Sequence, residues 1–89
     1  MAWRLEFGRQ ALKDLDDLGA DVRTRILRYL HDRVAVLDNP RQLGTALQGK
    51  RYKGLWRYRV GDIRVLAQIK DGAVTILVVE VGHRRDIYK

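Results

Sequence analysis

Three arginines, Arg57, Arg59 and Arg64, are the residues whose type and spacing best suit chemistry. They flank the dipeptide Gly61-Asp62, and glycine supplies the positive φ that a two-residue hairpin turn needs. If these two residues form the turn, Arg59 pairs with Arg64 across the strands, and Arg57 lies on the same face. Opposed like charges are unfavourable, unless an anion normally lies between them. The pattern therefore predicts an arginine face that binds phosphate oxygens, with three solvated, salt-screened arginines as the alternative.

A second group of candidates follows the last predicted strand: His83, Arg84, Arg85 and Tyr88. That strand is expected to neighbour the one that carries Arg64, so these side chains can reach the arginine face. Tyr88 either stacks on a base, a contact worth roughly 1–3 kcal/mol in single-strand recognition, or packs on the domain.

The net charge of +7 is unevenly distributed along the 89 residues. Residues 1–40 hold seven basic and seven acidic side chains, whereas residues 41–89 hold eleven basic and four acidic ones. Lys50, Arg51 and Lys53 belong to this basic half. Such a field suits nucleic acid or an acidic protein partner, and scattered solubility charge is the alternative.

The composition argues against several other functions. The chain has no cysteine, and its two histidines, His31 and His83, are far apart in sequence, so neither a metal site nor a cofactor is expected. No Ser/His/Asp or Cys/His set and no phosphate-binding glycine loop is apparent. The amino terminus lacks the apolar core of a signal peptide, and no run approaches ~20 apolar residues. We therefore expect a cytoplasmic protein with no membrane partner.

Apolar periodicity predicts the elements that position these groups. Residues 2–7 read as a strand, and Arg9–Leu18 as a helix that ends at Gly19. A second helix spans about Asp21–Leu37 and stops at Asn39-Pro40. After a basic loop at 41–54, the predicted strands are Leu55–Val60, Ile63–Lys70 and Ala73–Val81, joined by turns at Gly61-Asp62 and Asp71-Gly72. The prediction is one domain, 1–89, of two-layer α+β class: an N-terminal strand and an αα-hairpin packed on an antiparallel sheet of about four strands.

Strand alternation also predicts which sheet face the helices cover. The predicted apolar face carries Trp56, Tyr58, Val60, Ile63, Val65, Ala67, Ile69, Val74, Ile76 and Val78. Leu66, Leu77 and Val79 fall on the arginine face, so part of that face must be covered. Glu80 falls on the apolar face, which means that it lies beyond the edge of the core or that the register slips near it.

Two motifs resemble a known family. The run GLWRYRVGDIRVLAQI (Gly54–Ile69) and the later VGHRRDIY (Val81–Tyr88) are similar to RelE-type toxins of the RelE/ParE superfamily, which belong to bacterial and archaeal toxin–antitoxin pairs. The resemblance covers nearly the whole chain. The motifs are specific to the superfamily and less specific to one activity within it.

The resemblance implies an endoribonuclease that enters the ribosomal A site, cuts mRNA there and is restrained by a RelB-like antitoxin. Basic residues on the sheet support attack of the ribose 2′-OH on the neighbouring phosphate. On this basis the predicted catalytic residues are Arg57, Arg59, Arg64, Arg84 and Tyr88, and the predicted RNA-binding residues are Lys50, Arg51, Lys53, His83 and Arg85.

This chain departs from the family pattern at two points. Family members often have lysines where it has Arg57 and Arg59, and an arginine where it has Gln48. Because arginine stays protonated, the general base is left open between Tyr88, His83 and an RNA or ribosomal group, and the activity can be weak or altered. The alternatives are a ParE-like gyrase poison that cuts no RNA and a non-catalytic nucleic-acid-binding module.

Overall fold

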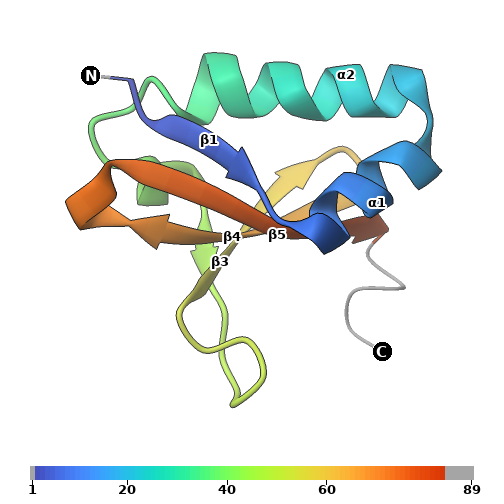
Figure 1. Cartoon of the computed structure of the whole chain (residues 1–89). Coiled ribbons are helices and arrows are strands. Elements are labelled where there is room, and N and C mark those ends of the chain that lie inside the picture. Colours follow the sequence, from blue (N-terminus) through green and yellow to red (C-terminus); the bar gives the residue numbers. More distant parts are fainter. Residues whose placement is uncertain (1, 84–89) are drawn as a thin grey trace.

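A computed structural model describes residues 2–83 of the chain. Two helices cover one face of a five-stranded sheet with the strand order β1-β5-β4-β3-β2 (Figure 1). Three short helical turns, one π-helical (η1) and two 3-10 (η2 and η3), complete the secondary structure of this part of the chain. In chain order the elements are β1 (Arg4–Phe7), α1 (Arg9–Leu18), α2 (Ala20–Tyr29), η1 (Leu30–Val34), η2 (Pro40–Leu43), β2 (Thr45–Ala46), β3 (Leu55–Val60), β4 (Ile63–Lys70), η3 (Asp71–Ala73) and β5 (Thr75–His83).

The predicted two-layer α+β class is confirmed, and the sheet differs from the prediction in two details. It is mixed, because β1 runs parallel to β5 with Arg4 opposite Thr75, and the two-residue strand β2 adds a fifth member. No tight turn joins β1 to its neighbour, so no turn chemistry in the sequence specified its direction. The amide of Arg4 donates to the carbonyl of Val74 at 2.9 Å, and the amide of Gly8 donates to that of Val78 at 2.8 Å. These two bonds join β1 to the neighbouring segment at its first residue and just after its last residue.

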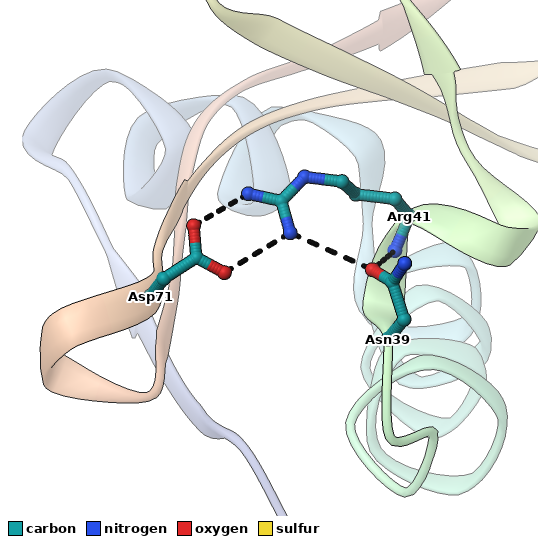
Figure 2. Close-up of polar contacts among 3 residues, drawn as sticks. All are labelled: Asn39, Arg41 and Asp71. Carbon is teal, nitrogen blue, oxygen red and sulfur yellow. Dashed lines mark hydrogen bonds and ion pairs between the residues drawn. The ribbon is translucent and has the colours of Figure 1, made fainter.

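The predicted two-residue turn between β4 and β5 is wrong. The connection has four residues, the 3-10 turn η3 and Val74, which adopts a left-handed conformation with φ 46°. The amide of Val74 donates to the carbonyl of Asp71 at 3.1 Å and closes the longer turn, and Arg41 donates to the two Asp71 carboxylate oxygens at 3.0 and 2.6 Å (Figure 2). The two additional residues preserve the alternation of the strand, so Ile76 and Val78 still lie in the core as predicted.

A β-bulge in β5 explains the anomalous position of Glu80. Ala67 pairs with Val78, but the next residue of β4, Leu66, pairs with Glu80, so one residue of β5 is skipped. Beyond the bulge the faces exchange, which brings Val81 into the core and places Glu80 opposite Leu66. The register slip that the sequence left as one of two possibilities is therefore present.

The helical layer follows the prediction with shifted ends. α1 has the predicted bounds, and its Leu12 is 53% exposed although Ala11 and Leu15 of the same helix are buried. The second helix begins at Ala20 and continues through η1, where the amide of Ala35 donates to the carbonyl of Leu30 at 2.8 Å. It therefore ends three residues before the predicted Leu37. Gly19 joins the two helices with φ 90°, a conformation that other residues rarely adopt.

The core forms between the helices and the predicted apolar face of the sheet. Its largest fully buried side chain is Tyr58, whose hydroxyl donates to the carbonyl of Pro40 at 2.8 Å. Gly44 lies so close that a Cβ there would be 3.2 Å from the Tyr58 ring, so glycine lets the η2 segment approach β3. Among residues 2–83, no helix has the length and apolar character needed to cross a membrane.

Candidate nucleic-acid interface

The β3–β4 hairpin has the predicted register, and this register defines the arginine face. Arg59 lies directly opposite Arg64, and Arg57 lies opposite Leu66. Tyr58 and Val60 alternate with these residues and enter the core beneath the helices. The three arginines therefore share the sheet face that points away from α1 and α2.

The three guanidinium groups differ in exposure. Arg59 is exposed, Arg57 is half-buried, and Arg64 is only 5% exposed. The Nη1 of Arg64 donates to the carbonyl of Gly61 at 3.4 Å, a long bond that holds the side chain against the turn. Leu66 on the same face is fully buried, which confirms that part of this face is covered. A ligand can therefore reach Arg59 from solvent, and Arg64 provides a fixed charge beneath it.

The predicted basic loop contains η2 and the short strand β2, and its exposed end is residues 47–54. Lys50, Arg51 and Lys53 are all exposed, and the connection extends away from the sheet (Figure 1). The Arg51 guanidinium lies 5.4 Å from the centroid of the Tyr52 ring, in the range of a cation–π contact. Gly54 has φ 86° at the point where the loop enters β3. The loop therefore presents three cations on an extension of the strand that carries Arg57 and Arg59.

His83 lies on the other side of the sheet. It pairs with Ile63 at the end of β5 and lines a small cavity of about 150 Å³ together with Val22 and Arg25 of α2. The prediction that His83 reaches the arginine face is therefore wrong, because the bulge in β5 moves His83 to the opposite face of the sheet. Arg84, Arg85 and Tyr88 lie outside the described residues.

Sequence reasoning missed a cation that adjoins this site from the helical layer. The guanidinium of Arg25 lies against Gly61, where a Cβ would be only 3.1 Å from its Nη2. Arg25 and Arg28 are three positions apart in one helix, and this spacing indicates that both lie on the same helix face. The equal numbers of acidic and basic residues in positions 1–40 concealed it.

Comparison with known proteins identifies the family. The family described as "ParE toxin of type II toxin-antitoxin system, parDE" matches residues 5–88, which is nearly the entire chain. The chain belongs to this family of type II toxins. Among curated proteins, the mRNA interferase toxin RelE of Escherichia coli K12 is 33% identical over 84 residues, covering 94% of this chain and 85% of the relative.

Solved structures agree with the toxin fold. The Mycobacterium tuberculosis RelBE2 complex contains a chain with a TM-score of 0.83 at 23% identity, covering 97% of this chain and 95% of that one. The intact E. coli RelBE complex gives a TM-score of 0.69 at 27% identity, covering 92% and 96%. The first likeness shows the fold alone. The second, at 27% identity, is a likeness of this chain in both fold and sequence to a chain of a RelBE complex.

Proposed function

We propose that this toxin is an endoribonuclease that cleaves mRNA in the ribosomal A site and thereby stops translation. The observation that carries the proposal is the hairpin register that gives Arg57, Arg59 and Arg64 a common face. The similarity to curated mRNA interferases supports the same activity. Action on ribosomes also implies a cytoplasmic location.

The proposed reaction is an internal phosphoryl transfer. The 2′-hydroxyl of a ribose gives its proton to a base and its oxygen forms a bond to the adjacent phosphorus. The bond from phosphorus to the 5′-oxygen of the next nucleotide breaks, and that oxygen leaves and takes up a proton as a hydroxyl. The pentacoordinate transition state gains negative charge on its non-bridging oxygens. Preorganised guanidinium groups stabilise that charge without exchanging a proton.

We assign electrostatic roles to the three sheet arginines and leave proton transfer to other groups. Arg59 is accessible to a phosphate, and the buried Arg64, which pairs with it and is held by its bond to Gly61, adds positive charge beneath the same anion. The family motif further assigns Arg84 and Tyr88 to catalysis. Since His83 belongs to the helix side, we assign the base to Tyr88 or to an RNA or ribosomal group. Lys50, Arg51, Lys53 and Arg85 are proposed to bind flanking RNA.

The proposed protein partner is a RelB-like antitoxin that masks the arginine face. Several of the similar solved structures are toxin–antitoxin complexes, including the RelE–RelB complex of Pyrococcus horikoshii, with a TM-score of 0.72 at 25% identity, covering 97% of this chain and 99% of that one. An exposed basic surface on the free toxin fits a partner that carries acidic side chains.

Gyrase inhibition is the second candidate, because the matching family is described by ParE. Adding the purified toxin to a translating extract and mapping mRNA ends by primer extension tests the first function, and a gyrase supercoiling assay tests the second. Cuts in phase with codons support the nuclease. Loss of supercoiling without cuts refutes the nuclease function. If neither effect is seen, the remaining function is nucleic-acid binding without catalysis.

Variants connect the activity to the arginine face. We expect Arg59→Ala to lower the cleavage rate about 100-fold or more, as removal of one oxyanion donor does elsewhere. Arg4→Ala is the matched control, because Arg4 is also exposed but lies on β1 at the opposite edge of the sheet. Arg64→Ala and Arg84→Ala are also expected to abolish toxicity with the circular dichroism spectrum retained. Equal loss in Arg59→Ala and Arg4→Ala would refute the assignment.

A further inference from the structure

A groove of about 590 Å³ lies between the helical layer and the end of β3. It opens beside the Gly61 turn, so it adjoins the arginine face without being part of it. The charged side chains that line it are Arg25, Arg28, Arg33, Arg59, Asp21 and Asp32.

The arginines of this groove are not neutralised by the fold. Within residues 2–83, none of the four guanidinium groups makes a hydrogen bond or an ion pair, and the arginines exceed the two aspartates in number. Asp32 already accepts from Nδ1 of the neighbouring His31 at 2.8 Å. A concave site with unneutralised guanidinium groups attracts an anion that offers several oxygens.

The groove and the arginine face are continuous around the Gly61 turn. Arg25 lies against Gly61 from the helix side, and Arg64 donates to the Gly61 carbonyl from the arginine face. Arg59 belongs to both surfaces, since it pairs with Arg64 and also lines the groove. Because β2 pairs with β3 only at Trp56 and Arg57, no described strand separates the two surfaces beyond that point.

We propose that this groove is a second RNA-binding site, which holds backbone phosphates of the same single strand that crosses the arginine face. The inference rests on the proposed function, since it extends the path of that strand. A phosphate backbone repeats its charge at regular intervals, so a strand bound at Arg59 brings further phosphates to Arg28 and Arg33. The shared residue Arg59 favours RNA over an acidic peptide, which would need no connection to the arginine face.

The test measures binding of single-stranded RNA by fluorescence anisotropy at several salt concentrations. The probes are 2′-O-methyl RNAs of about three and about twelve nucleotides, one shorter than common single-strand site sizes and one within their range. Methylation blocks the attacking hydroxyl, so the probes stay intact. The groove variant is Arg28→Ala/Arg33→Ala, and the charge-matched control is Arg4→Ala/Arg9→Ala. Arg4 and Arg9 are exposed and lie outside the groove.

We expect the groove variant to bind the long RNA about tenfold or more weakly. The slope of log affinity against log salt should fall by about 1.4 for two lost phosphate contacts. Binding of the short RNA should be unchanged, and the control should lose much less than the groove variant. Equal losses in the two double variants, or equal binding of short and long RNA by the unaltered protein, would overturn the proposal.

Two additional measurements separate the remaining outcomes. If a glutamate-rich peptide loses affinity for the groove variant while long RNA does not, the groove is a site for a protein partner, and the proposal is wrong. Binding of the short RNA by Arg59→Ala tests the proposed function separately. Unchanged short-RNA binding there would remove the arginine face as the primary site, whatever the groove does.

Discussion

Replacing Tyr58 by phenylalanine removes one oxygen from the centre of the molecule. That oxygen donates to the carbonyl of Pro40 at 2.8 Å, and Tyr58 is fully buried. The variant keeps the ring but leaves the carbonyl without its donor, which costs about 1–3 kcal/mol for a buried acceptor. For a domain of this size we expect the melting temperature to fall by roughly 4–24 °C.

The same substitution has a signature at alkaline pH. Burial raises the pKa of Tyr58 from 10.0 to about 12, so the folded state favours the neutral phenol more strongly than the unfolded state does. The resulting contribution to stability is fully present below pH 10 and is lost as the pH rises from about 10 to about 12. Phenylalanine does not ionise, so the stability gap between the two proteins should narrow across this interval.

Urea unfolding followed by circular dichroism at pH 7 and across the alkaline range measures both effects. Tyr29→Phe is the control at pH 7, because the Tyr29 hydroxyl makes no hydrogen bond within the described part of the chain. Equal stability of Tyr58→Phe and the unaltered protein at pH 7 would refute the hydrogen-bond argument. A gap that stays constant from pH 10 to pH 12 would refute the argument from burial.

Three other substitutions test how the site is supported. The hydrogen bond from Arg41 lowers the pKa of Asp71, so the stability that depends on this carboxylate is lost as the pH falls below 3.8. Asp71→Asn has no carboxylate at this position, and the variant should therefore lose less stability on acidification than the unaltered protein. Urea midpoints at pH 3 and pH 5 measure this, and equal acid losses in the two proteins would contradict it. Asp14→Ala should destabilise the fold by about 1 kcal/mol and speed hydrogen exchange at the Val81 amide, which donates to Asp14 at 3.0 Å; unchanged exchange there would show that the bond contributes little. Gly61→Ala should cost about 1 kcal/mol or more in denaturant unfolding, because φ is 62° at this position, and no measurable loss would argue against that conformation.

Local sequence chemistry predicted the hairpin that carries the site. Gly61-Asp62 specified the turn, and the alternation of apolar residues from Trp56 to Ala67 specified which face enters the core. Both features depend only on residues close together in sequence, so the folded chain retains them whatever the distant segments do. The arginine face could therefore be predicted from the residue order of two strands and the turn between them.

Features that depend on distant partners could not be predicted in the same way. The connection after β4 is longer than Asp71-Gly72 alone indicates, and the Arg41 guanidinium binds it from a segment thirty positions earlier. The direction of β1 and the bulge before Glu80 likewise depend on packing between remote segments. The groove beside Arg25 needed α2 to be placed against the Gly61 turn, which periodicity alone does not determine.

The strand order has a consequence for synthesis of the toxin. β5 is the last strand among residues 2–83, yet it lies between β1 and β4. The N-terminal strand therefore has no partner, and the apolar sides of both helices lack much of their packing surface, until residues 75–83 have left the ribosome. During its own translation the growing chain has no completed sheet. The ribosome that synthesises the toxin is accordingly not exposed to an assembled copy of it until this late segment has emerged.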